Sequence, residues 1–285
     1  MDAVIEKRGY LLEDFRLFHL RSGGMEDVDF HYHDFHKLVL VLSGSGAYVV
    51  EGRRYLLQPG DVVLVSRGSI HRPEIGRGSS YERAIFYISD DYLKGHTIGE
   101  WNPSILFDKC NSHVLRLTPD DHETMCRDLS LLEAELGSNS PESVLMSRCR
   151  FMCMLLSLYR LSTGGQSTTP LPAEPGDEKV ISIIHYLNDH ITEDISIDHL
   201  SEIFYISKFH MMRRFRQEAG MPIHAYLNEK RLFMARDLIS KGMSATEACY
   251  QSGFKSYSAF SRAYQKRFQV TPTGRVSLYT GEISD

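Results

Sequence analysis

The sequence predicts a multidomain β + α protein. We expect an N-terminal β-barrel followed by two helices, and then an all-α domain with two helix-turn-helix motifs. Three observations predict this: short apolar runs between turn residues early in the chain, two amphipathic helical stretches after them, and one helix-turn-helix pattern that occurs twice. We place the domains at residues 1–161 and 178–285, joined by a linker at 162–177.

Short strands are expected between Phe15 and Ile88. The runs are rich in Val, Leu, Ile and Tyr, and turns that contain Gly or Pro separate them. These runs are Leu38–Leu42, Ala47–Val50, Tyr55–Leu57, Val62–Val65 and Ala84–Ile88. Strands this short and evenly spaced favour a sandwich or a small barrel, which could hold a ligand inside.

Two helices are expected after the barrel. Thr118–Glu135 begins with a Thr cap, a Pro at the first position and acidic residues in the first turn. Pro141–Leu161 carries apolar residues along one side. This pair either packs only on its own barrel or forms a dimer interface, and the sequence leaves both open. The stretch 162–176 is rich in Gly, Pro, Ser and Thr, which is typical of a flexible linker.

The two helix-turn-helix patterns are 49 positions apart. In the second, Ser244 and Ser256 are expected to cap its helices and Gly253 to provide a left-handed stop. In the first, Ser196 and Ser207 take the capping places. The buried stripe of each second helix repeats with the same shift, at Met211 and Phe215 and then at Phe260 and Tyr264. A long helix, Pro222–Ser240, is expected between them.

The C-terminal segment resembles the DNA-binding domain of the AraC/XylS-type transcription regulators over about a hundred residues. The matching residues are Pro222 and Tyr226, the run Arg231–Ala235, Gly253-Phe254, Phe260-Ser261-Arg262, Phe268 and Thr271-Pro272. The resemblance implies sequence-specific binding to double-stranded DNA. It also implies activation through contact with RNA polymerase and control by an effector, for which a carbohydrate is one class.

The helical period divides each second helix into a buried stripe and a free face that can enter a DNA major groove. The residues expected to contact bases are Phe209, Met212, Arg213, Arg216, Tyr257, Ser258, Ser261 and Arg262. Arg213 is the expected bidentate partner of guanine, and Ser261 and Arg262 stand where similar regulators contact bases. The residues expected to contact phosphates are Lys208, Arg214, Lys255, Lys266 and Arg267.

Histidines mark two segments of the barrel, which resemble the signature motifs of cupins. His31 and His33 alternate on one strand, so both imidazoles can face His71 on a neighbouring strand. His36 has the opposite parity, and Lys37 stands where the family has glutamate. We expect His31, His33, Lys37 and His71 to bind a small polar effector. We expect no cofactor and no metal; the weak candidate ligands for one are the same three histidines.

Composition and charge fit a globular protein that meets DNA with one domain. The net charge is −5, but residues 178–285 hold 14 Lys and Arg against 12 Asp and Glu, a balance of +2, and the remainder carries −7. The chain shows no signal-peptide layout and no apolar run near the roughly 18–20 residues of a membrane span. Its five cysteines lack C-x-x-C spacing. We therefore expect a cytoplasmic protein without a membrane partner.

The sequence thus predicts a ligand-responsive transcription regulator, not an enzyme, that works as a homodimer. Two alternatives stay open. A cupin metalloenzyme with a DNA-binding tail would need a metal with an open coordination position, and Lys37 counts against it. A constitutive DNA-binding protein would use the barrel only for dimerisation.

Overall fold

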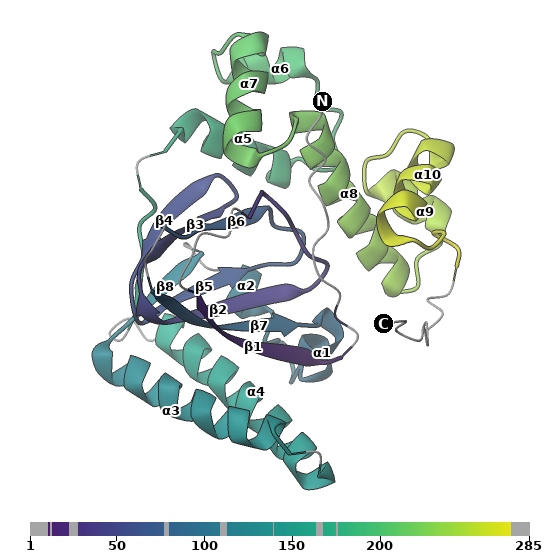
Figure 1. The fold of residues 1–285 in the computed structure, drawn as a ribbon. Coiled ribbons are helices and arrows are strands. Elements are labelled where there is room, and N and C mark those ends of the chain that lie inside the picture. Colours follow the sequence, from purple (N-terminus) through teal and green to yellow (C-terminus); the bar gives the residue numbers. More distant parts are fainter. Residues whose placement is uncertain are drawn as a thin grey trace, which may run out of the picture. The chain divides into compact units, whose positions relative to one another are not determined.

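The computed structural model describes residues 11, 13–22, 28–76, 80–108, 113–138, 140–163, 168–174 and 176–274. The chain divides into two compact units, Met1–Asp177 and Glu178–Asp285, which are described one at a time (Figure 1). The first is rich in strands and the second is helical, so the predicted fold class is confirmed. Among the described residues, no helix has the length and apolar character that crossing a bilayer requires.

Two antiparallel sheets build the first unit. The larger has the order β1-β7-β2-β5-β8-β9, and the smaller has the order β4-β3-β6. The strands are β1 (Phe15–Ser22), β2 (His36–Gly44), β3 (Gly46–Val50), β4 (Arg53–Leu57), β5 (Asp61–Val65), β6 (His71–Glu74), β7 (Tyr81–Ile88), β8 (Val114–Leu117) and β9 (Thr168–Pro170). All five runs predicted as strands lie within these strands, whereas β1, β6, β8 and β9 were not among the predicted runs.

The pleat of the strands sorts their side chains between an inner and an outer core. Val39 and Val41 of β2 point inward with Ile85 of β7 and meet Tyr48 and Val50 of β3. This inner core lies in the space that the two sheets enclose. Side chains of the opposite parity, among them those of Leu38, Leu40 and Phe86, belong to the outer core.

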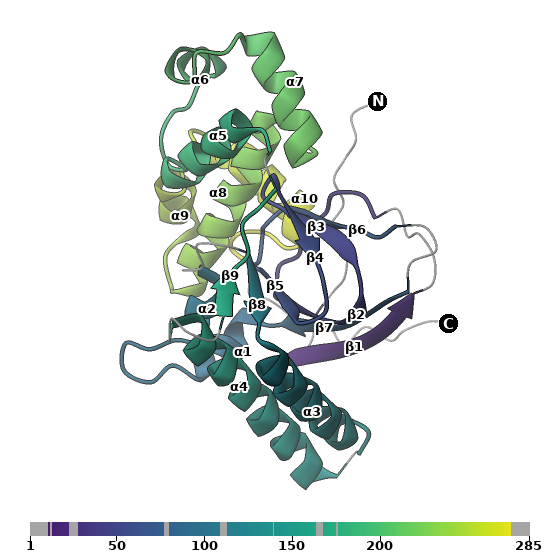
Figure 2. The ribbon, with the colours of Figure 1, turned by 90° about the vertical axis from the view of Figure 1, so that its left-hand side faces the viewer.

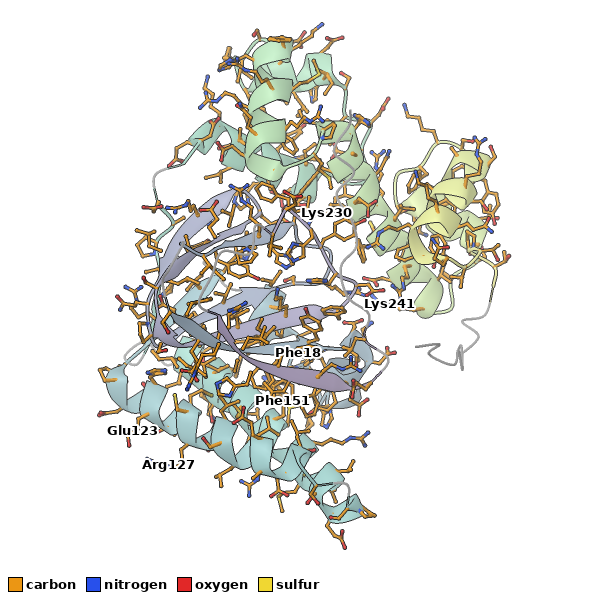
Figure 3. All side chains as sticks on the ribbon, in the orientation of Figure 1. Phe18, Glu123, Arg127, Phe151, Lys230 and Lys241 are labelled. Atoms are coloured by element: carbon orange, nitrogen blue, oxygen red, sulfur yellow. The ribbon has the colours of Figure 1, made fainter. Side chains whose placement is uncertain are left out.

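Two antiparallel helices cover the outer face of the larger sheet. These are α3 (Pro119–Leu136) and α4 (Pro141–Thr163), and they lie side by side (Figure 2). Thr118 caps α3 as predicted. Phe151 of α4 stacks on Phe86 at 4.8 Å between ring centroids, on the side of the sheet opposite Phe18 (Figure 3). Short helices α1 (Asp90–Gly95) and α2 (Ile105–Asp108) precede β8.

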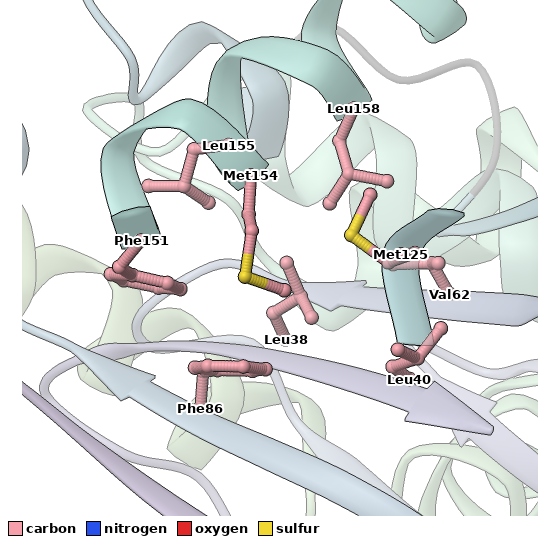
Figure 4. A pocket seen from close by; sticks show the side chains of 9 residues that line it. All are labelled: Leu38, Leu40, Val62, Phe86, Met125, Phe151, Met154, Leu155 and Leu158. Atoms are coloured by element: carbon pink, nitrogen blue, oxygen red, sulfur yellow. The ribbon is translucent and has the colours of Figure 1, made fainter. Parts of the chain in front are cut away.

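The outer core is closely packed. Between α3, α4 and the sheet remains an apolar void of about 10 Å³, lined by nine side chains that include Phe86, Met125 and Met154 (Figure 4). A void of this size is at the lower limit for a single water molecule. The outer core is therefore not a place for an effector.

The segment expected to be a flexible linker is partly structured. Helix α4 continues to Thr163, and β9 pairs with β8 in the larger sheet. Leu171 donates its backbone N–H to the carbonyl of Val114 at 2.9 Å, and its side chain packs on the inner core together with Ala173. No pattern in the sequence indicates the pairing of β9 with β8, because Thr168–Pro170 joins the sheet through its backbone.

Six helices build the second unit over its described residues, 178–274. They are α5 (Glu178–Asp189), α6 (Ile197–Ile203), α7 (Lys208–Ala219), α8 (Ile223–Ser240), α9 (Ala245–Gln251) and α10 (Tyr257–Phe268). Helix α8 contacts both helical groups, since it packs against α5 and α7 and also against α9 and α10. Its residues Leu232 and Ala235 share a core with Phe260 and Tyr264 of α10. The predicted linking helix is thus the shared support of both motifs.

Candidate functional site

Helices α6 and α7 form the first helix-turn-helix motif. Ser196 caps α6 by accepting a hydrogen bond from the N–H of His199, as predicted. The turn contains Tyr205 with φ of +48°, and the hydroxyl of Ser201 donates to the carbonyl of Ile206 at 2.8 Å. Ser207 occupies the cap position of α7, but its side chain makes no capping hydrogen bond. The turn is therefore fixed from the α6 side rather than by the second cap.

Helix α7 buries one side and exposes the other. Met211 and Phe215 are fully buried, as the repeat predicts. Phe209 has 74% of its surface exposed, and Met212 is exposed as well. Two arginines, Arg213 and Arg216, lie on the exposed side too. An apolar side chain exposed to this degree on a recognition helix is suited to thymine methyl groups, and an exposed guanidinium is suited to guanine.

Helices α9 and α10 form the second motif. Ser244 and Glu247 make a reciprocal capping box at the start of α9, and Ser256 caps α10. Gly253 has φ of +88°, and a Cβ on it would lie 2.9 Å from both Arg231 Nε and Thr192 Cα. The left-handed stop predicted at Gly253 is confirmed. The position also needs glycine because other chain segments approach it closely.

Helix α10 presents a smaller and more polar face than α7. Ser258 and Arg262 are exposed, whereas Ser261 is half-buried. Tyr257 is half-buried too, because its ring packs 5.8 Å from that of Phe260. The structure therefore brings the predicted base-contacting residues of α10 to one end and one side of the helix, with Tyr257 partly used for packing.

The predicted phosphate-contacting residues divide into two groups. Lys266 is exposed, while Lys208 and Lys255 are exposed and form surface ion pairs with Asp198 and Asp194. Such pairs contribute little stability, so both lysines can exchange them for phosphates. Arg214 is half-buried, with its guanidinium 3.5 Å from a ring nitrogen of His210.

Arg267 does not fit the predicted phosphate contact. Its side chain is only 6% exposed, and its Nε donates to Glu229 of α8 at 2.8 Å. The guanidinium also stacks on Phe233 and Phe268, 4.9 and 5.1 Å from the ring centroids. Arg267 therefore joins α10 to α8. The sequence placed it outside because its helical position lies beside Lys266, and nothing local shows that α8 covers it.

Three histidines meet in the first unit. His31 and His71 form a β-bridge through two backbone hydrogen bonds of 3.0 and 2.9 Å. One ring nitrogen from each of His31, His33 and His71 lies within 4.8 Å of the others, and all three residues are buried. The predicted meeting of these side chains on a shared face is confirmed. His36 faces the other way, against Phe107 and 3.5 Å from Asp90.

Hydrogen bonds to the backbone orient two of these imidazoles. His31 Nδ1 lies 2.8 Å from the carbonyl oxygen of Asp29, and His71 Nδ1 lies 2.9 Å from that of Ser69. A carbonyl can only accept, so Nδ1 of His71 carries the proton, and Nε2 of its neutral ring has a free lone pair. Burial and then the charge of Lys37 lower the pKa of His71 well below its ordinary value, which keeps the ring neutral.

Lys37 lies beside the histidines inside the sheets. Its ammonium is 5.7 Å from the ring centroid of Tyr48 and 5.9 Å from that of Tyr87. Burial, followed by repulsion from Arg83, lowers its pKa to about 7. Geometrically the three imidazoles could hold a divalent cation. The neighbouring ammonium opposes a cation, however, and among the described residues the cluster suitable for a metal contains no carboxylate.

Comparison with known proteins assigns both units. Residues 18–152 match the family described as AraC-like ligand binding domain, and residues 200–274 match a helix-turn-helix domain family. The matched segments follow one another in the order that the sequence predicts. The chain belongs to the AraC-type transcription regulators.

Curated relatives of this AraC-type protein include the HTH-type transcriptional activator RhaS of Escherichia coli (strain K12 / DH10B). It is 25% identical over 247 residues, which are 86% of each chain. RhaS of Shigella sonnei gives the same values. Among solved structures, fatty-acid-bound ToxT from Vibrio cholerae aligns with 91% of this chain and 93% of its own, at 15% identity and a TM-score of 0.36. The C-terminal domain of AraT from Geobacillus stearothermophilus aligns with 38% of this chain and 94% of its own, at 24% identity and a TM-score of 0.33.

The sequence of this AraC-type regulator did not reveal the structural roles of two arginines. Arg231 of α8 donates to the carbonyls of Ile191 and Glu193 at 2.7 and 2.6 Å, so it ties the long helix to the segment before the first motif. Arg83 of β7 is buried with the parity of Ile85 and acts on Lys37 from the inner side of the sheet. The inward parity of Arg83 was available from the alternation of β7, had the strand been extended to Tyr81.

Proposed function

We propose that this AraC-type regulator activates transcription from sites that α7 and α10 read together, under the control of an effector held between the sheets of its first unit. The observation that carries the proposal is that two helices, both packed against α8, each expose one face. Phe209 and Arg213 on α7 are exposed, as are Ser258 and Arg262 on α10, while the opposite faces are buried.

Each recognition helix has a different chemistry toward DNA. Helix α7 offers apolar side chains and two arginines, Arg213 and Arg216, which favour thymine methyls and guanine. Helix α10 offers Arg262, which favours guanine. It also offers the short hydroxyl side chains of Ser258 and Ser261, which can bond to more than one kind of base. The phosphate contacts of Lys208, Lys255 and Lys266 would fix the register without reading bases.

The effector would bind where His31, His33, His71 and Lys37 converge. Support comes from their burial in one cluster and from the match of residues 18–152 to a ligand-binding family. An effector that binds two arrangements of the units with different affinity shifts the population between them and so changes DNA occupancy. Activation is supported by the relatives named as activators, and it would proceed through contact with RNA polymerase in the cytoplasm.

Helices α3 and α4 would join two copies of the chain. Their outer faces expose several large apolar side chains, among which Leu145 has 63% of its surface exposed. The other exposed ones are Leu131, Leu136, Val144 and Met146. Large apolar side chains exposed on two neighbouring helices favour burial against another copy of the chain. A homodimer would present four recognition helices to DNA.

Selection of binding sites from random duplex DNA by the full-length protein tests this function. We expect an enriched motif with two blocks about one helical turn, roughly 34 Å, apart, repeated where a dimer binds. Lys94→Ala, a change of an exposed residue on α1, is the control and should leave the motif unchanged. A motif with a single block would contradict reading by both helices, and no enrichment would contradict sequence-specific binding by the free protein.

A further inference from the structure

The side chains that face the space between the two sheets are apolar in one region and polar or charged in another. Side chains with inward parity on β2 include Lys37 beside Val39 and Val41, and those on β7 include Arg83 beside Ile85. Both cationic residues are buried. Lysine and arginine are seldom buried without a partner, because removing their charge from water is costly. The burial of Lys37 on the inner side of the sheet therefore needs an explanation.

No carboxylate of the described residues neutralises Lys37. Burial and repulsion by Arg83 both lower the pKa of Lys37, and no acidic side chain raises it. The faces of Tyr48 and Tyr87 supply only a partial compensation. Asp61 of β5 is also buried, but it lies four residues from Val65, the strand partner of Lys37. It also accepts two hydrogen bonds from Arg116, of 2.7 and 2.8 Å. The ammonium of Lys37 consequently has no opposite charge among the described residues.

Two further buried polar atoms belong to residues that neighbour Lys37. The hydroxyl of Tyr48 and Nε2 of His71 are buried and have no hydrogen-bond partner within the part of the chain that the structure describes. Their rings are stacked, with centroids 5.9 Å apart, and Lys37 lies over the Tyr48 ring. Buried polar atoms in native proteins are almost always satisfied, so unpaired ones indicate a bound molecule. One of the two is a donor, and the other is an acceptor.

We propose that the effector is a small hydroxylated anion, whose acidic group binds Lys37 and the hydroxyl of Tyr48 and whose alcohol donates a hydrogen bond to His71 Nε2. The proposal deepens the effector site of the proposed function and rests on it. The ammonium and the phenol O–H both favour an anionic oxygen. The neutral His71 ring can only accept at Nε2, so it selects a ligand with a hydroxyl. A sugar acid or a sugar phosphate has both groups.

A neutral sugar fits the same atoms less well. It could satisfy His71 and Tyr48, but it would leave the buried charge of Lys37 without an opposite charge. A metal ion bound to the three histidines would be repelled by Lys37, and Arg83 would add to that repulsion. Both occupants are therefore outcomes that the experiment must separate from an anion.

Isothermal titration of the full-length protein with matched pairs of probes tests the proposal. The pairs are galacturonate with galactose, gluconate with glucose, and glucose 6-phosphate with glucose; zinc chloride is titrated alone. We expect at least one carboxylate or phosphate to bind, and its neutral partner to bind at least tenfold more weakly or not at all. The carboxylate and phosphate arms distinguish the two kinds of acid.

Two variants connect the binding to the named atoms. Lys37→Met should weaken the anion by tenfold or more, and Tyr48→Phe should weaken it by severalfold. Lys94→Met, which removes an exposed lysine of the same unit, should not. Equal binding of a neutral sugar, binding of none of the anions, or zinc binding that depends on His71 would overturn the inference. The DNA selection described above does not depend on this result. The proposed DNA recognition by α7 and α10 and the proposed chemistry of the effector are therefore tested separately.

Discussion

Replacing Lys37 by methionine should make the free protein more stable, although it removes a residue of the proposed effector site. The pKa of Lys37 falls from 10.5 to about 7, because burial takes the ammonium out of water and Arg83 repels it. The unfolded chain therefore binds more protons than the folded chain between these two values, and stability rises with pH across that window. Methionine keeps most of the length of the side chain and has no charge to bury.

The size of the effect follows from the displacement of the pKa. With each pKa unit worth about 1.4 kcal/mol, the protonation of Lys37 in the unfolded chain disfavours folding by about 4 kcal/mol at pH 7 and about 2 kcal/mol at pH 9. We expect Lys37→Met to raise the unfolding free energy by nearly that amount at pH 7, and by less at pH 9. A residue that costs this much stability is typical of a binding site.

Urea unfolding followed by tryptophan fluorescence measures the unfolding free energy of the first unit, which contains Lys37. The chain contains one tryptophan, Trp101, which belongs to the first unit. Lys94→Met is the matched control, because Lys94 is exposed and its ion pair with Asp90 contributes less than about 1 kcal/mol. If Lys37→Met unfolded at the same urea concentration as the wild type at pH 7, and both showed the same change toward pH 9, Lys37 would not be a buried, uncompensated charge.

Three further outcomes are expected in the second unit. Arg213→Ala and Arg262→Ala should each relax specificity at particular base pairs, by about 1–3 kcal/mol in a binding-site selection, whereas Lys266→Ala should weaken all sequences alike; an unchanged specificity profile would remove that arginine from the base contacts. Arg267→Ala should lower the melting temperature in circular dichroism through the loss of about 1–3 kcal/mol, and a fully stable variant that binds all DNA weakly would restore the phosphate contact. Gly253→Ala should cost roughly 1–2 kcal/mol of stability, measured by urea unfolding, because of its positive φ; a neutral result would show that the turn can rearrange.

Much of the DNA-binding unit could be predicted because its signals are local. The caps at Ser196, Ser244 and Ser256 each act within three residues of their helix start, and the buried stripe of a helix repeats every three or four residues. The repetition of one pattern at a spacing of 49 added an internal check. The prediction of the strands was less complete, since β1, β6, β8 and β9 were not among the predicted runs. The last three have only three or four residues each and gain their stability from neighbouring strands.

The histidine cluster that we propose as the effector site was predicted in part. Parity on the strand placed His31 and His33 on one face, and the structure confirms that His71 joins them. Tyr48 and Arg83 were not named, because the sequence could not show which strands would lie opposite Lys37. Nor could it show that this lysine lacks a carboxylate partner, since a partner can come from any part of the chain.

The sequence by itself determined the two-part organisation, the positions of the recognition helices and the sides of them that are buried. These properties arise from helical and strand periods, from capping and from turn residues, which act over a few neighbouring positions. Only the tertiary structure decided the state of individual charges. Arg267 lies in a helix like Lys266, yet Phe233 and Glu229 of α8 enclose it. A charged side chain keeps its water or loses it according to what packs over it, and the packing elements are distant in the sequence.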